Sequence, residues 1–232
     1  MAVAIIEKFL NLLFPKYCLG CKKEGVWICD ECAATLVYVK ITLCPWCSKV
    51  PTVCGFVCQE CKAKTHLSQI IWAYDYNLLL VEKMVLSLKY AYVEEIAEFM
   101  GNALARQFSA ETRKDTDYIV IPIPLHKKRM RERGFNQAER IGRAFAKQLG
   151  ILSAPHVLAR VKHTKSQVGL SKEERSKNVS EAFRVRDASA LVGKSIILID
   201  DVYTTGATMR EAASALIAAG AKKVIGVAFA KG

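Results

Sequence analysis

Two different patterns of apolar and polar residues divide the chain near residue 67. Beyond that point, short apolar runs that suit buried strands alternate with segments whose apolar residues recur every three or four positions. This alternation predicts an α/β fold in which helices flank a mostly parallel sheet. Strands are expected at about 70–76, 118–122, 156–159, 182–185, 195–200 and 223–230, and helices at about 78–90, 93–108, 136–149, 173–179 and 208–219.

The first 66 residues lack this alternation. Residues 3–14 have the spacing of a short amphipathic helix, which we expect to dock on the protein rather than on a membrane surface. Glu7 and Lys8 interrupt its apolar face, so the segment lacks the core of a signal peptide. No apolar run approaches the roughly 18 residues of a transmembrane helix. We therefore expect a small N-terminal unit, residues 1–66, and a larger domain, residues 67–232.

Cysteine is concentrated in the N-terminal unit. Eight of the nine cysteines form four Cys-x-x-Cys pairs, and the chain beyond residue 61 has none. Two residues between thiolates let one tight turn direct both sulfurs at one cation, and two such turns complete a tetrahedral zinc site. The expected zinc ligands are Cys18, Cys21, Cys29, Cys32, Cys44, Cys47, Cys58 and Cys61.

The spacing leaves the grouping of these four turns open. In the simplest arrangement the first two turns form one site and the last two form another, but an interleaved arrangement has the same spacing. Cys54 is the odd thiol, and we expect it not to be a ligand. Four thiolates leave no open position on a zinc ion, so both sites should be structural and form a small double zinc-ribbon domain. Unpaired thiols in this number indicate the cytoplasm.

One segment carries the strongest indication of function. Residues 196–199 are apolar and β-favouring, Asp200 and Asp201 follow, and a turn through Gly206 opens a helix near Thr208. The free N–H groups and the positive dipole end of a helix N-terminus favour an anion. The carboxylates suit vicinal hydroxyls or a bridging metal ion. The segment therefore predicts a sugar-phosphate site, and the chain contains neither a P-loop nor a dinucleotide motif.

Positive charge gathers in two stretches of the larger domain. The formal net charge is +12. Residues 126–143 contain seven Lys or Arg against two Glu, and residues 160–177 contain six against two. Polyanionic ligands are therefore expected in this domain.

The segment 196–208 resembles the phosphoribosyl-diphosphate (PRPP) motif of the type I phosphoribosyltransferases, and every position of the motif is matched. The resemblance implies that Asp200 and Asp201 hold the ribose hydroxyls and stabilise positive charge at C1′. It also implies that Mg²⁺ accompanies the pyrophosphate, and that the second basic stretch lies in a mobile loop over the site. The implied ligands of the 5′-phosphate are Tyr203, Thr204, Thr205, Gly206, Ala207 and Thr208, and those of the pyrophosphate are Arg129, Arg133, Gly134, Arg160 and Lys162.

Nearly the whole chain resembles the ComF family. The resemblance rests on the paired Cys-x-x-Cys turns, on residues 131–138 (Arg-x-Arg-Gly-Phe-Asn-Gln-Ala), on residues 167–171 (Gln-x-Gly-Leu-Ser) and on the PRPP motif. It implies a double zinc ribbon fused to a type I phosphoribosyltransferase-like domain, a link to DNA uptake in natural transformation, and binding of PRPP and of nucleic acid. A DNA-uptake helicase is a candidate partner that the sequence leaves open.

Two functions remain open at this point. The favoured one is a phosphoribosyltransferase whose acceptor the sequence does not name. The alternative is a PRPP-sensing adaptor without turnover, in which the basic stretches bind single-stranded DNA. Trp27, Trp46 and Trp72 are expected to serve packing rather than base stacking, and His126, His156 and His163 are expected to be ordinary loop or strand residues.

Overall fold

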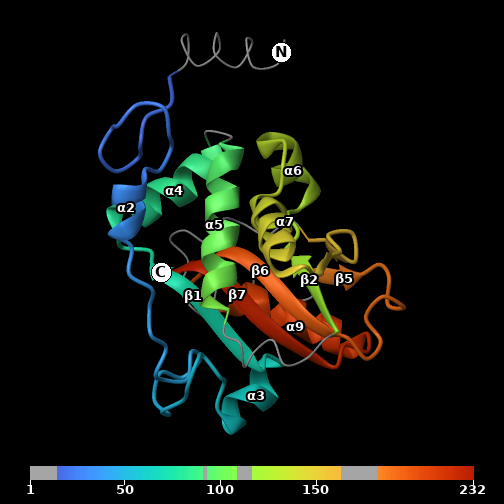
Figure 1. Cartoon of the computed structure of the whole chain (residues 1–232). Helices are drawn as coiled ribbons and strands as arrows, with labels where there is room; N and C mark the ends of the chain where they lie inside the picture. Colours follow the sequence, from blue (N-terminus) through green and yellow to red (C-terminus); the bar gives the residue numbers. More distant parts are fainter. Residues whose placement is uncertain (1–14, 91–92, 109–116, 163–181) are drawn as a thin grey trace.

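A five-stranded parallel sheet forms the centre of the molecule (Figure 1). The structure is a computed structural model and describes residues 15–90, 93–108, 117–162 and 182–232. The strand order is β1-β7-β6-β2-β3. The strands are β1 Gln69–Asp75, β2 Tyr118–Pro122, β3 Leu152–Ser153, β6 Ser195–Tyr203 and β7 Lys223–Lys231. The predicted α/β fold is therefore confirmed.

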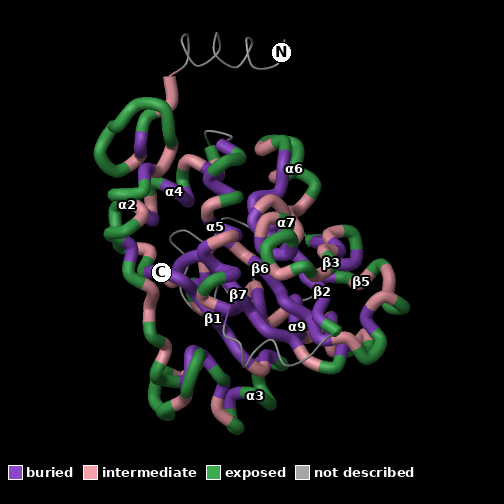
Figure 2. The backbone as a smooth tube through the Cα atoms, viewed as in Figure 1, coloured by how far each residue is buried: buried purple, intermediate pink, exposed green. Residues whose placement is uncertain are grey.

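Helices cover both faces of this sheet. Helices α4 (Leu79–Tyr90), α5 (Glu94–Gln107) and α7 (Gln137–Leu149) lie over one face, and α9 (Ala207–Ala218) lies over the other (Figure 1). Because both faces are covered, β2 and β7 are buried almost throughout, as Figure 2 shows. The apolar runs seen in the sequence are the strands of this buried sheet.

The strands expected near 156–159 and 182–185 do not join the sheet. They form β4 (Leu158–Arg160) and β5 (Phe183–Val185), which pair with each other in antiparallel fashion. Strands joined by a loop can pair antiparallel, whereas joining them in parallel needs a crossover element. The place beside β2 is taken by β3, which the sequence did not predict.

The basic segment directly after β2 contains a helix that the sequence did not predict. Helix α6 spans Lys127–Arg133, and its Lys, Arg, Met and Glu residues are good helix formers. The His126 side chain accepts a hydrogen bond from Lys128 N, and Gly134 ends the helix in the left-handed conformation (φ 80°). The helices expected at 3–14 and 173–179 lie outside the described residues.

Residues 15–66 run along the β1 side of the sheet and contain two short helices (Figure 1). Helices α2 (Asp30–Ala34) and α3 (Gln59–Thr65) each begin directly after the first cysteine of a Cys-x-x-Cys pair. Among the described residues, every helix is too short or too polar to span a lipid bilayer.

Candidate functional site

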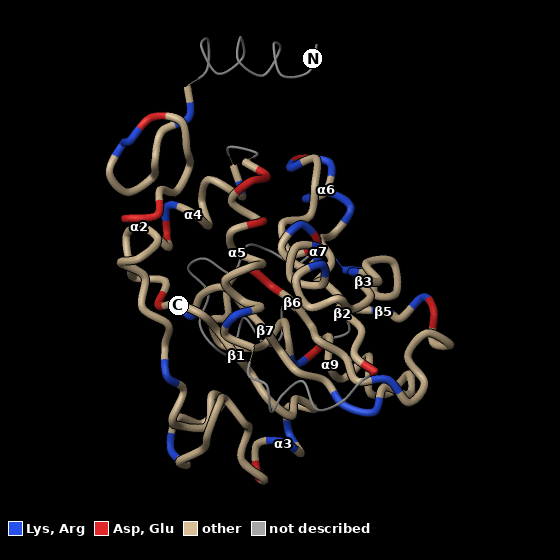
Figure 3. Tube along the Cα trace, in the orientation of Figure 1, with Lys and Arg blue, Asp and Glu red and all other residues tan. Residues whose placement is uncertain are grey.

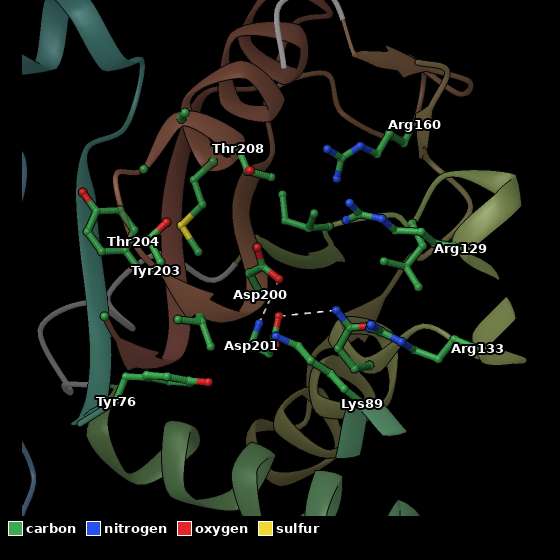
Figure 4. Close-up of a pocket in the computed structure, with 18 of the residues that line it drawn as sticks. Tyr76, Lys89, Arg129, Arg133, Arg160, Asp200, Asp201, Tyr203, Thr204 and Thr208 are labelled. Atoms are coloured by element: carbon green, nitrogen blue, oxygen red, sulfur yellow. Dashed lines mark hydrogen bonds and ion pairs between the residues drawn. The ribbon is translucent and has the colours of Figure 1, made fainter. Parts of the chain in front are cut away.

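A cavity of about 610 Å³ opens at the carboxyl ends of β2 and β6. In a parallel sheet the crevice beyond these strand ends is the usual ligand site. The cavity is lined from one side by the turn after β6 and from the other by α6 and the end of β4. Figure 4 shows Asp200 pointing into the space between these two sides.

The turn after β6 leads into the N-terminus of α9, where backbone N–H groups can bind an anion. Gly206 caps this helix in the left-handed conformation (φ 76°), and no side chain caps the first-turn N–H groups. These groups therefore keep their donor capacity for a ligand. Thr204, Gly206, Ala207 and Thr208 line the cavity. The Thr205 hydroxyl is buried, and no hydrogen-bond partner for it is found within the described residues.

The two adjacent carboxylates have different surroundings. Asp201 is 5% exposed, and its Oδ2 lies 2.5 Å from Lys89 Nζ at the end of α4. Gln137 Nε2, at the start of α7, donates to Asp201 Oδ1 at 3.3 Å, while Arg133 Nη1 donates to Gln137 Oε1 at 2.5 Å. Asp201 is therefore held by protein groups, whereas Asp200 is the carboxylate that faces the cavity (Figure 4).

This arrangement moves the pKa values of the pair in opposite directions. Burial and the negative charge of Asp201 raise the pKa of Asp200 well above its ordinary value. Burial acts on Asp201 in the same sense, but Lys89 and the hydrogen bonds outweigh it and lower the pKa of Asp201 to about 2. Burial disfavours the charged form of Lys89, yet Asp201 and Asp200 together raise its pKa. The two carboxylates are therefore coupled, and Asp201 is the one that loses its proton more readily.

Arginines line the opposite side of the cavity. Arg160, on β4, is only 9% exposed, and its guanidinium lies 5.4 Å from the centre of the Phe183 ring. Burial and the nearby charge of Arg129 lower its pKa. Two cations held together in a partly closed space favour a polyanion between them. Figure 3 shows basic residues along α6.

The structure brings together most of the expected site residues, but not all. Both aspartates and three arginines line the cavity, together with most of the turn after β6: Asp200, Asp201, Arg129, Arg133, Arg160, Tyr203, Thr204, Gly206, Ala207 and Thr208. The expected ligands Thr205 and Gly134 are not among the lining residues. Lys162 is exposed and is not among the lining residues. The rest of the second basic stretch, residues 163–177, lies outside the described residues.

Sequence reasoning missed Lys89 and Gln137. A lysine at the end of an amphipathic helix is normally solvated, so nothing in the local pattern marks Lys89 as a partner of Asp201. Gln137 lies within the segment 131–138, but its role depends on a contact 64 residues away in the chain. Tyr76, which also lines the cavity, had no signal either.

The eight paired cysteines form two groups in the sequential arrangement. The first contains Cys18, Cys21, Cys29 and Cys32, and the second contains Cys44, Cys47, Cys58 and Cys61; within each group the sulfurs lie within 4.8 Å of one another. We call these the first and second cysteine groups.

The sulfur distances fit four-coordinate zinc. The pairs Cys18–Cys29, Cys21–Cys29 and Cys47–Cys58 are 3.7, 3.6 and 3.9 Å apart. A zinc ion with Zn–S bonds of about 2.3 Å has tetrahedral edges of about 3.8 Å, whereas a disulfide would bring sulfurs to about 2.05 Å. Both groups could therefore bind zinc. Cys54 belongs to neither group.

Comparison with known proteins identifies the family to which this chain belongs. Competence protein ComFC of Bacillus subtilis (strain 168) is 30% identical over 203 residues, which cover 83% of this chain and 79% of that protein. The chain belongs to the ComF family. DNA utilization protein YhgH of Salmonella typhimurium is 30% identical to this ComF-family chain over 221 residues, covering 92% of this chain and 96% of that protein.

A phosphoribosyl transferase domain model matches residues 136–232 of the ComF-family chain. A solved structure, glutamine PRPP amidotransferase from B. subtilis complexed with ADP and GMP, is 18% identical and aligns with a TM-score of 0.37 over 56% of this chain and 25% of that one. The match to the domain model contains the turn after β6 and both aspartates, and ends with β7.

Proposed function

We propose that this ComF-family protein binds PRPP with Mg²⁺ in the cavity at the end of β6 and uses it as a phosphoribosyl donor. The observation that carries the proposal is that three chemically different subsites share one cavity. They are an uncapped helix N-terminus after Gly206, a carboxylate at Asp200, and a buried guanidinium at Arg160. A 5′-phosphate, a ribose and a pyrophosphate present the matching groups in that order.

Each part of the site has a role in this proposal. The turn Thr204–Thr208 holds the 5′-phosphate, and Asp200 holds the ribose hydroxyls and Mg²⁺. Asp201, fixed by Lys89 and Gln137, supplies negative charge near C1′ as positive charge develops there. Arg129 and Arg160 hold the leaving pyrophosphate. Charge stabilisation and positioning are expected to supply most of the rate.

Calorimetry with PRPP and Mg²⁺ tests this assignment. The double variant Asp200→Asn and Asp201→Asn should lose PRPP binding while its zinc content stays at the wild-type level. Unchanged PRPP affinity in this variant would contradict the proposal. The single variant Asp117→Asn is a matched control that should keep wild-type PRPP affinity, because Asp117 is exposed and outside the cavity lining.

The pH dependence of binding separates the two aspartates. Because the pKa of Asp200 is raised, Asp200 is protonated at pH values below it and cannot hold Mg²⁺ there. PRPP affinity should therefore rise with pH through the pKa of Asp200, and Asp200→Asn should flatten this dependence. Asp201 should not contribute over this range, because its pKa is lowered to about 2.

A second function, an adaptor without turnover, has its own support. Helix α6 presents Lys127, Lys128 and Arg131 on an exposed surface beside the cavity. Such a surface suits the phosphates of single-stranded DNA. Pyrophosphate release with candidate acceptors supports the enzyme, whereas salt-sensitive DNA binding without release under any acceptor supports the adaptor.

The relatives give this proposal its context. ComFC is named a competence protein and YhgH a DNA utilization protein, and these names support our proposal that this chain acts in DNA uptake or use. We also propose that it acts in the cytoplasm, since its nine cysteines are free thiols. We keep the domain boundary between residues 66 and 67, since α3 ends at Thr65 and β1 begins at Gln69. We also propose a DNA-uptake helicase as a candidate partner.

A further inference from the structure

A residue of the N-terminal region contacts the turn Thr204–Thr208, which we assign to the 5′-phosphate and call the phosphate turn. A Cβ built on Gly206 would lie 2.7 Å from Trp46 Cζ3 and 2.9 Å from the Tyr203 hydroxyl. Gly206 is therefore enclosed by two aromatic side chains, and any side chain at this position would collide with them. Glycine is therefore required at position 206 for two reasons: its φ is positive, and only a residue without a side chain leaves room for Trp46 and Tyr203.

Trp46 also contacts the first turn of α9. The Arg210 guanidinium lies 5.8 Å from the centre of the Trp46 ring, within cation–π range. Arg210 N donates to Gly206 O, so both contacts of Trp46 fall on the same first turn of the helix. Trp46 therefore packs against the turn whose free N–H groups form the anion site.

A second contact comes from the residue before Trp46. The Tyr203 hydroxyl donates to Pro45 O at 3.1 Å. The Tyr203 ring in turn stacks on Trp72 of β1, with ring centres 5.8 Å apart and planes 3° apart. Tyr203 is thus fixed between the sheet and Pro45, at the point where β6 ends and the phosphate turn begins.

Pro45 and Trp46 are the two residues between Cys44 and Cys47. Their position is therefore determined by where these two thiols point. Cys58 N donates to Cys44 Sγ at 3.4 Å, and Cys44 N donates to Val50 O at 2.7 Å, so the turn is folded around the second cysteine group. In the first group the corresponding residues are Leu19 and Gly20, and no contact between them and the phosphate turn is found within the described residues.

We propose that Trp46 is a positioning residue for the phosphate turn, through which the second cysteine group holds residues 204–210 in the conformation that binds an anion. The four thiols would hold the zinc ion, which supplies the fixed geometry of the turn. Pro45 O orients Tyr203, and the Trp46 ring packs against Gly206 and Arg210. The binding part of this inference rests on the proposed function, whereas the positioning part does not.

Three variants test the inference in the full-length, zinc-loaded protein. Trp46→Ala removes the packing surface, and Trp46→Phe keeps an aromatic face. Trp27→Ala is the matched control, because Trp27 lies close to the first cysteine group, two residues before Cys29. Trp27 is half-buried and packs against the core formed with α4, α5 and α7, on the face of the sheet opposite α9. Metal analysis first establishes that each variant keeps its zinc. Should Trp46→Ala lose zinc, Trp46→Leu takes its place.

The first readout is amide hydrogen exchange without ligand. We expect Trp46→Ala to increase exchange of the Arg210 N–H, which is hydrogen-bonded to Gly206 O, by about tenfold or more, Trp46→Phe to change it little, and Trp27→Ala to leave it unchanged. Unchanged exchange in Trp46→Ala overturns the inference, whatever the protein binds.

The second readout is PRPP affinity with Mg²⁺ by calorimetry. Trp46→Ala should weaken binding by about tenfold and Trp46→Phe by less than about threefold. Faster exchange with unchanged affinity overturns the inference. If wild-type protein binds no PRPP, the proposed function fails, and the exchange result alone decides whether Trp46 positions the turn.

Discussion

The two cysteine groups each combine two Cys-x-x-Cys turns and share one N–H···S hydrogen bond, but they are attached to the sheet in different ways. The N–H of Cys29 donates to Cys18 Sγ and that of Cys58 donates to Cys44 Sγ, both at 3.4 Å. Beyond this shared turn the groups differ. Ile70 N, at the second residue of β1, donates to Gly55 O at 2.8 Å, so the second group is joined to the sheet by backbone pairing.

The first group is attached mainly by side chains. Lys83 Nζ donates to Leu19 O at 3.2 Å, and Lys16 forms an ion pair with Glu95; both lysines belong to exposed or half-buried surfaces. The difference indicates that the same repeated Cys-x-x-Cys turn can be attached to the larger domain in two ways. The segment of the first group contacts α4 and α5, whereas that of the second contacts the candidate site through Pro45 and Trp46.

The largest effect should come from removing one ligand of each group. Cys47→Ser and Cys21→Ser should each lose one zinc ion per chain by metal analysis. Cys47→Ser should weaken PRPP binding by about tenfold or more, because the turn that carries Trp46 loses its fixed geometry. Cys21→Ser should stay within about threefold of wild type. Equal losses of affinity would contradict the distinction between the groups.

Substitutions at Gly55 and Gly25 test whether the second cysteine group is held to the sheet by its backbone contact with β1. A Cβ on Gly55 (φ 77°) would lie 2.2 Å from Ile70 O, which is backbone and cannot move away, whereas a Cβ on Gly25 (φ 94°) meets nothing within 4 Å. Gly55→Ala should cost about 3 kcal/mol or more of unfolding free energy, and Gly25→Ala about 1 kcal/mol from its positive φ alone. Urea unfolding measures both. Similar costs would show that the second group is not held by β1.

A smaller effect is expected from the hydrogen bonds that join each group to the larger domain. Tyr203→Phe removes the donor to Pro45 O, and it should lower the unfolding free energy by about 1 kcal/mol because the bond is buried. Lys83→Met removes the donor to Leu19 O, which solvent can replace, and should cost less than about 0.5 kcal/mol. The reverse order would mean that the first group is the more firmly attached one.

The smallest effect concerns the surface ion pair. Glu95→Gln removes the partner of Lys16, and the unfolding free energy should fall by less than about 0.5 kcal/mol, because both side chains are substantially exposed. The difference should vanish at high salt. A loss that persists in about 1 M salt would show that packing, not charge, holds the first group at this point.

The sequence predicted the features that depend on neighbours in the chain. The buried strands, the helices at 79–90 and 137–149, the Cys-x-x-Cys turns and the acid pair before a helix all follow from local spacing. Contacts between distant segments have no such signal. The pairing of β4 with β5, which leaves both outside the sheet, depends on where the chain returns after residue 162.

The sequence by itself determined the fold class, the eight cysteines suited to zinc, and Asp200, Asp201 and the turn to Gly206 as the candidate site, because each is encoded within a few consecutive residues. The tertiary structure decided which of the two aspartates is held by Lys89 and which faces the cavity. It also decided that only the second cysteine group touches the phosphate turn within the described residues. The physical reason is that burial and charge pairing act between side chains brought together by folding, and Trp46 meets Gly206 across 160 positions of sequence.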